Sequence, residues 1–144
     1  MPLARAEGDH GGARIGEVNI QTIDPEFAPT AAGGYTQGLR VADLSDLLFI
    51  SGQVPETPSG HIPDDFEAQC RQVWANVISV LTAAGLTTNN LLKVTTYLSD
   101  RRHAETNSRV RREMLGIHRP ALTVVIAGIY HERWLLEIEA MAGA

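Results

Sequence analysis

Two carboxylates near the end of the chain, Glu137 and Glu139, have the residue type and spacing that could do chemistry. In a β-strand, side chains two positions apart point to the same face, so these carboxylates share one face while Leu136, Ile138 and Ala140 share the other. A carboxyl group withdrawn from water has a raised pKa, which suits it to general acid or base catalysis. The alternative is that both carboxylates pair with arginines or backbone amides. We assign Glu139 to that structural role and leave both roles open for Glu137.

Tyr35 and Ser51 are the candidate ligand-binding residues in the first half of the chain. Tyr35 follows Gly33-Gly34, so its ring is expected to close a cleft, although it could also pack with its hydroxyl at the surface. Ser51 ends an apolar run before Gly52, where its hydroxyl and the next amide could bind a ligand or satisfy a local backbone group. Covalent catalysis by Ser51 is not expected, because no histidine stands at a recognisable partner position.

The remaining reactive side chains favour neither a metal nor a cofactor. The 5 histidines are scattered without the paired spacing of metal ligands, so no metal site and no cofactor are expected. Cys70 lies on the apolar stripe of a predicted helix, where a thiol behaves as a small hydrophobic side chain with a raised pKa. As the single cysteine it cannot form an internal disulfide, which suits a reducing cytosol.

The charge of the chain argues against a nucleic-acid partner. The formal net charge is −5, whereas affinity for nucleic acids depends on clustered positive charge. The spacing of Glu105, Arg109 and Glu113 is that of stabilising pairs on a helix surface, and no aromatic platform for single-stranded RNA accompanies them. A solvated helix face is therefore predicted for the five clustered arginines: Arg101, Arg102, Arg109, Arg111 and Arg112.

Length and composition predict one soluble, cytoplasmic domain. The 144 residues suffice for a single core, no run approaches the ~18 apolar residues of a membrane span, and the N-terminus lacks the order of a signal peptide. Residues 1–16 are predicted to form a flexible leader and residues 17–144 the domain. Lys93 is the only lysine among 12 basic residues, and this arginine bias, with the many alanines, favours a GC-rich bacterial genome.

Hydrophobic periodicity predicts the elements that position these residues. Strands are expected at six places: 18–23, 36–42, 47–53, 91–98, 121–129 and 135–142. Residues 43–46 are expected to join the second and third strands as a hairpin. The order of elements is β-β-β-α-β-α-β-β, which indicates an α+β fold with a mixed sheet and both helices on one face.

The two helices are predicted from apolar stripes and capping signals. The first should span residues 66–84, with Asp64 as its N-cap, Glu67 as the capping-box partner and Gly85 at its end. Asp100 is expected to cap the second helix, which continues to residue 115.

The strand at 121–129 is apolar on both alternations apart from Thr123. One face of this strand must meet the helices, and the other needs cover as well. A single layer of helices leaves that second face bare, so a partner subunit is expected to cover it.

Several segments, in this order and spacing, resemble the RidA/YjgF family, small trimeric proteins whose best-studied members hydrolyse reactive enamines and imines. They extend from Thr22 to Ala142: Gly33-Gly34-Tyr35-Thr36-Gln37-Gly38, Leu48-Phe49-Ile50-Ser51-Gly52-Gln53-Val54-Pro55, Ala83-Ala84-Gly85-Leu86, Asn107, Arg119-Pro120-Ala121 and Glu137-Ile138-Glu139-Ala140. The resemblance implies a chorismate-mutase-like fold and a homotrimer with a central barrel. It also implies small-molecule clefts between the subunits.

The resemblance further implies which side chains line the cleft. Glu137, with a backbone carbonyl, would position the water that attacks an imine carbon. The substrate-binding residues would be Tyr35, Ser51, Gly52, Asn107, Leu122 and Thr123.

At the position of Leu122 the family usually has an arginine that binds the substrate carboxylate. Each hydrogen bond from such a charged group contributes about 1.5–3 kcal/mol, and leucine offers none. Arg119 and Arg133 are poorly placed to replace it, because Arg119 is an odd number of residues away on the strand and Arg133 lies in a turn. Imino acids derived from amino acids are therefore expected to bind poorly, and a neutral or apolar ligand to bind better.

Three functions stay open for this chain. It could be a homotrimer that hydrolyses an imine, enamine or related electrophile without an essential carboxylate. It could instead be a non-catalytic trimer that binds or senses a small ligand in the same cleft. The third and weaker hypothesis is an endoribonuclease that acts through its arginines, since fold alone does not determine function.

Overall fold

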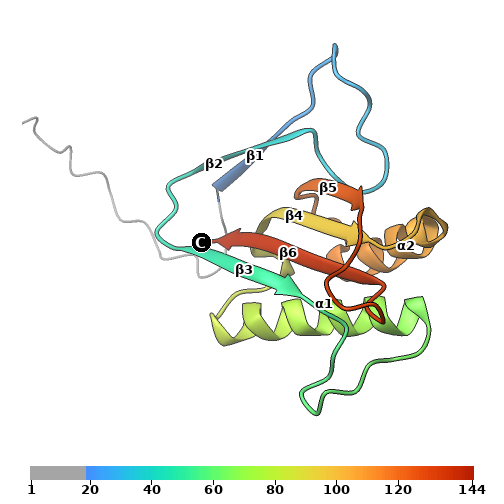
Figure 1. Ribbon diagram of the computed structural model, residues 1–144. Coiled ribbons are helices and arrows are strands. Elements are labelled where there is room, and N and C mark those ends of the chain that lie inside the picture. Colours follow the sequence, from blue (N-terminus) through green and yellow to red (C-terminus); the bar gives the residue numbers. More distant parts are fainter. Residues whose placement is uncertain (1–18) are drawn as a thin grey trace, which may run out of the picture.

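The computed structural model describes residues 19–144, so the predicted leader at 1–16 lies outside the described residues. The predicted order of elements is confirmed (Figure 1). The bounds of the strands and helices are β1 Asn19–Ile23, β2 Gly38–Ala42, β3 Leu47–Gln53, α1 Phe66–Ala83, β4 Leu91–Leu98, α2 Ala104–Leu115, β5 Ala121–Ile126 and β6 Leu136–Gly143. Within residues 19–144, no helix combines the length and the apolar character needed to cross a membrane.

The main sheet has four strands in the order β3-β6-β4-β5. Strand β6 is antiparallel to both β3 and β4, whereas β4 and β5 are parallel, which confirms the mixed sheet and the α+β class. A parallel pair needs a long crossover connection, and α2 supplies it here. Strands β1 and β2 form a separate antiparallel pair, which lies on the side of the main sheet opposite α1 (Figure 1).

The hairpin predicted between 36–42 and 47–53 is wrong, because β2 pairs with β1 and β3 pairs with β6. The connecting segment uses its backbone groups elsewhere. The amides of Ser45 and Asp46 donate to the carbonyl of Ala144 at 2.7 and 2.9 Å, and the Ala144 amide donates back to Asp46 at 3.1 Å. Asp43 also adopts a positive φ of 60°, so the chain turns a corner towards the end of β6 and does not form a ladder with β2.

The loop between β1 and β2 is closed by the Asp24 side chain. Its carboxylate accepts hydrogen bonds from the Gln37 amide at 2.7 Å and from the Thr36 hydroxyl at 2.8 Å. These bonds, the amide bond foremost, hold the pKa of Asp24 below its usual value. The two ends of the long loop are thereby joined where β2 begins.

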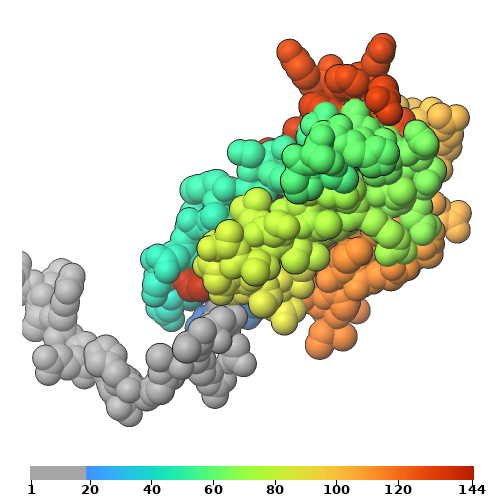
Figure 2. All heavy atoms as spheres, turned by 90° about the horizontal axis from the view of Figure 1, so that it is seen from below, coloured from blue at the N-terminus to red at the C-terminus, as the bar shows by residue number. Residues whose placement is uncertain are grey.

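Both helices pack on one face of the main sheet and share one core. Figure 2 views this side, with α1 in green and the region around α2 in orange. The core contains residues from every layer: Cys70, Val73, Trp74, Val77 and Leu81 of α1, Val94 and Leu98 of β4, Val110 of α2, and Leu136 and Ile138 of β6. Burial raises the pKa of the Cys70 thiol to about 12, in agreement with the predicted core role.

The first helix begins one residue later than the predicted cap implies. Asp65 is the N-cap, and its carboxylate accepts from the Ala68 amide at 2.9 Å, so the assignment of Asp64 is wrong. Both positions carry an aspartate, and the sequence alone could not decide which one adopts the extended cap conformation. Glu67 therefore forms no capping box and instead pairs with Arg71 and Arg109.

Strand β5 is shorter than predicted, since it ends at Ile126 and not at residue 129. It forms one edge of the main sheet. Val124, Val125 and Ile126 are 41%, 39% and 38% exposed in the single chain. Val124 and Ile126 share the face of Leu122, and Val125 lies on the opposite face, so both faces of this edge strand are partly exposed in a single chain, whereas only one bare face was expected.

Core packing predicts that two truncations of apolar side chains differ greatly in their effect on the free energy of unfolding. Leu136→Ala removes a side chain with no solvent exposure and should lower the free energy of unfolding by about 2–5 kcal/mol. Ile117→Ala removes a side chain that is 98% exposed and should change it by less than about 0.5 kcal/mol. Denaturant unfolding of both variants measures the difference, and equal losses would contradict the assigned core.

Candidate functional site

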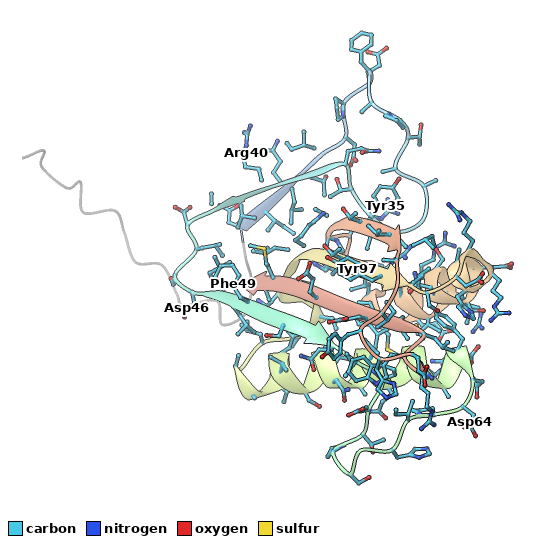
Figure 3. All side chains as sticks on the ribbon, in the orientation of Figure 1. Tyr35, Arg40, Asp46, Phe49, Asp64 and Tyr97 are labelled. Carbon is cyan, nitrogen blue, oxygen red and sulfur yellow. The ribbon has the colours of Figure 1, made fainter. Side chains whose placement is uncertain are left out.

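The candidate site lies on the open face, our name for the side of the main sheet turned away from the helices. Burial alternates along β4 and β6, so the open face carries five polar side chains: Lys93, Thr95, Tyr97, Glu137 and Glu139. Phe49 and Tyr97 are labelled on this side in Figure 3. The side chains between them, including Leu136 and Ile138, are buried beneath the helices.

Glu137 lies against a β-bulge in β3. The register between β3 and β6 shifts between Ile50 and Gln53, so Ser51 and Gly52 form the irregular part. A methyl group at Gly52 would overlap with Oε1 of Glu137 and lie 2.8 Å from its Cδ. Glycine at this position thus lets the carboxylate approach the backbone, and bulges commonly occur beside active sites. Within residues 19–144 the carboxylate of Glu137 forms no hydrogen bond or ion pair, so it can accept one from a water or ligand.

Glu139, by contrast, already has a hydrogen-bond partner in Tyr97. The Tyr97 hydroxyl donates to Oε1 of Glu139 at 2.8 Å. This bond stabilises the protonated phenol and, with burial and the charges of Glu139 and Glu137, raises the pKa of Tyr97 above 10.0. The structure therefore gives Glu139 a paired, structural arrangement, with a tyrosine as partner and not an arginine.

Leu122 and Thr123 face opposite sides of the sheet. Leu122 pairs with the buried Val94 in the parallel register and packs against the core on the helix side. Thr123 pairs with Thr95 and faces the open side, where its hydroxyl accepts a hydrogen bond from Nζ of Lys93 at 2.7 Å. Leu122 is consequently on the other face from Glu137 within one chain.

Tyr35 lies next to the start of β5. Its neighbour Thr36 forms an isolated parallel bridge with Ala121, and the Thr36 amide donates to Pro120 at 3.4 Å. Tyr35 and Arg119 together line a cavity of about 330 Å³.

The expected site residues therefore fall into separate groups. Tyr35, Leu122 and Thr123 belong to the β5 edge of the main sheet, and Ser51 and Gly52 belong to the β3 edge, beside Glu137. Three strand spacings, or about 14 Å, separate the two edges. One chain does not bring all of these residues together.

Asn107 belongs to neither group. It is 2% exposed, and its Oδ1 lies 4.0 Å from the Cys70 sulfur between the two helices. Its position in a single chain is therefore in the core.

The arginine cluster is only partly the solvated face that was predicted. Arg109 pairs with Glu67 and Glu113, which supports the surface-pair interpretation. Arg111, however, is only 4% exposed and donates from Nη2 to the carbonyl of Gly33 at 3.0 Å, so that part of the prediction is wrong. The physical reason is that Arg111 tethers the Gly33 turn to α2.

Sequence reasoning missed Lys93 and Tyr97 as site residues. The signal was present, because in a strand at 91–98 the side chains of Lys93, Thr95 and Tyr97 must share one face. Glu137 and Glu139 lie on the same face because β4 pairs with β6, and this pairing cannot be inferred from the sequence.

The mixed four-stranded sheet with two helices on one face places the chain in the class of α+β proteins. Residues 26–144 match the family model described as Endoribonuclease L-PSP. The chain therefore belongs to the RidA/YjgF family.

Two curated relatives illustrate the similarity. A RutC family protein of Pyrococcus horikoshii is 36% identical over 124 residues, which cover 85% of this chain and 96% of the relative. The 2-iminobutanoate/2-iminopropanoate deaminase of Escherichia coli is 34% identical over 126 residues, with 85% and 96% covered.

Solved structures give the same assignment. A Rid-family protein from Yersinia pestis, YyfB, matches with a TM-score of 0.77 at 26% identity and covers 88% of this chain and 99% of its own. Escherichia coli TdcF with bound serine matches with a TM-score of 0.66 at 33% identity, with 86% and 98% covered.

The close approach of Glu137 to Gly52 predicts a coupled pair of substitutions. Gly52→Ala should force the Glu137 side chain into another rotamer, because its methyl group overlaps with Oε1, and should lower the free energy of unfolding by about 0.5–1.5 kcal/mol. In a Glu137→Ala background the same change should cost much less, since the overlapping atoms are gone. Unfolding of the four proteins of this double-mutant cycle measures the coupling, and equal costs in both backgrounds would contradict the geometry.

The Tyr97–Glu139 bond predicts an altered tyrosine titration. Glu139→Gln should lower the pKa of Tyr97 towards 10.0, whereas Glu137→Gln should lower it less, because Glu137 acts only through its charge. Ultraviolet titration, with Tyr97→Phe subtracted, isolates this residue. Since the folded pKa is raised, the stability from this bond is present below pH 10.0 and should be lost as pH rises through the folded pKa. A larger shift in Glu137→Gln would overturn the assignment.

Proposed function

We propose that this protein is a homotrimer that binds a small molecule in clefts between its subunits. In these clefts Glu137 positions a water that hydrolyses an imine, enamine or related electrophile lacking a carboxylate next to the reactive carbon. The observation that carries the proposal is the Glu137 carboxylate, which lies against Gly52 and forms no hydrogen bond or ion pair within residues 19–144. A carboxylate so placed can orient water and accept its proton.

The division of site residues between two sheet edges supports a cleft formed by two subunits. Tyr35 is next to the β5 edge and Ser51 is in β3 at the other edge, about 14 Å away. A ligand small enough for one cleft reaches both groups only if the β5 edge of one copy approaches the β3 edge of another. The exposed apolar residues Val124 and Val125 give the β5 region a surface that such contact would bury.

Leu122 supports a change in substrate preference. The related deaminase is named for 2-iminobutanoate and 2-iminopropanoate, and TdcF was solved with serine, all molecules with a carboxylate. In this chain the side chain at the position of the family arginine is apolar and packs against the core. A carboxylate placed there would lose its hydration without gaining a charged partner.

The alternative functions differ in what they require of the site. A non-catalytic trimer would bind its ligand without product, so the ligand would raise the melting temperature and stay unchanged. An endoribonuclease acting through α2 is disfavoured, because Arg109 is paired with glutamates and Arg111 is buried. The endoribonuclease hypothesis would be favoured if the purified trimer cuts RNA and the double variant Arg109→Ala/Arg112→Ala loses this activity.

The direct test is hydrolysis of freshly generated imines with and without an adjacent carboxylate. We expect the natural protein to hydrolyse only imines without the carboxylate, and Leu122→Arg to gain at least about tenfold on those that carry it, equivalent to one charged hydrogen bond. Comparable activity of the natural protein on both substrate sets would contradict the role given to Leu122.

Glu137→Gln tests the catalytic role separately. It should reduce turnover by about 10²–10⁴-fold, the usual contribution of a general acid or base, while sedimentation still gives a trimer. Glu132→Gln, which changes an exposed glutamate in the turn before β6, is the matched control and should retain most of the turnover. Unchanged turnover in Glu137→Gln would remove this residue from the mechanism, and a monomer in the natural protein would end the proposed cleft.

A further inference from the structure

We propose that Lys93 binds the anionic group of an elongated ligand on the open face, well separated from Glu137. This inference rests on the proposed function and specifies its substrate class. The ligand would carry its negative charge several bonds away from the electrophilic carbon, and not on the adjacent atom as in a 2-imino acid.

The first support is the state of the Lys93 ammonium group. It donates to the Thr123 hydroxyl at 2.7 Å, which uses one of its three donors. No carboxylate of residues 19–144 lies within ion-pair distance of it, in contrast to Arg71 and Arg109, which both pair with glutamates. Lys93 therefore offers two donors and a charge that the described chain does not neutralise.

The second support is a cavity next to this group. A cavity of about 310 Å³ opens on the open face, at the lower end of the range for small-molecule sites. Lys93, Thr95, Ser51 and Glu139 supply its polar lining, and Phe49 and Met141 supply apolar surface. It thus joins a cation, two hydroxyls and a carboxylate within one small volume.

The third support is the side of the sheet on which the charge lies. Leu122 packs against the core on the helix side, whereas Lys93 shares its face with Glu137 and Glu139. The one lysine of the chain thus provides positive charge on the side where the candidate catalytic carboxylate lies.

Strand geometry sets the length of the ligand. The ammonium is bonded to Thr123, which pairs with Thr95, while Glu137 pairs with Tyr97. Two strand spacings across and two residues along the sheet separate Thr123 from Glu137, roughly 12 Å between backbones. The side chains of Lys93 and Glu137 extend into this span and shorten it. The remaining distance is still longer than the single bond that joins the carboxylate to the imine carbon in a 2-imino acid.

Glu139 defines the middle of the ligand. Its carboxylate lines the same cavity and lies on β6 between Met141 and Glu137. Because it is negatively charged and already accepts from Tyr97, it favours a hydrogen-bond donor such as an amine or amide, and it disfavours a second anionic group.

Binding of 6-aminohexanoate tests the inference without any turnover. This probe carries a carboxylate for Lys93 and, five methylene groups away, an ammonium for the carboxylates. Calorimetric titration of the assembled protein should give a Kd for 6-aminohexanoate at least tenfold lower than for hexylamine, which lacks the carboxylate. Lys93→Met should remove that preference, and Lys93→Arg should retain it.

The controls separate this site from others. Arg119→Met, which removes the cation of the cavity beside Tyr35, should leave binding unchanged. Three outcomes would each overturn the inference. They are an equal loss of probe affinity in Arg119→Met and Lys93→Met, binding of hexylamine as tight as that of 6-aminohexanoate, and no binding of 6-aminohexanoate. Because the readout is binding of a probe that cannot be hydrolysed, a failure here is distinct from a failure of imine hydrolysis.

Discussion

The position of β6 between β3 and β4 is the constraint on which the rest of the structure depends. Its ladder hydrogen bonds are satisfied on both sides, so every second side chain is committed to the core and every other one to the open face. Leu136 and Ile138 are buried against the helices, and strand alternation therefore places Glu137 and Glu139 on the opposite face. A register slip of one residue would exchange these two sets, which makes the position of the carboxylates as stable as the core itself.

Local signals in the sequence predicted what local physics determines. Strand β4 was predicted with its observed bounds, because its apolar and β-branched residues lie between Asn89-Asn90 and Ser99-Asp100, residue types that are depleted in strands. Gly85 was placed correctly at the end of α1, where it adopts a positive φ of 74°. The N-cap was displaced by one residue because Asp64 and Asp65 are chemically equivalent candidates.

Long-range pairing is what the sequence could not supply. The corner at Asp43–Asp46 has the composition of a hairpin turn, yet its amides bond to Ala144 at the other end of the chain. The same limit applies to the site. The shared face of Glu137 and Glu139 follows from strand alternation, but the face of Leu122 and the closeness of Lys93 to Thr123 depend on the parallel register of β4 and β5.

The β5 edge also has a consequence for how the protein is produced. Pairing β4 with β5 must wait until α2 has crossed between them, so this edge forms by contacts distant in sequence, which are slow to assemble. In a single chain the edge presents unpaired backbone groups beside Val124, Val125 and Ile126. If the proposed trimer covers this edge, newly made chains would divide between association and aggregation, and the outcome would depend on how fast they are synthesised relative to how fast they meet.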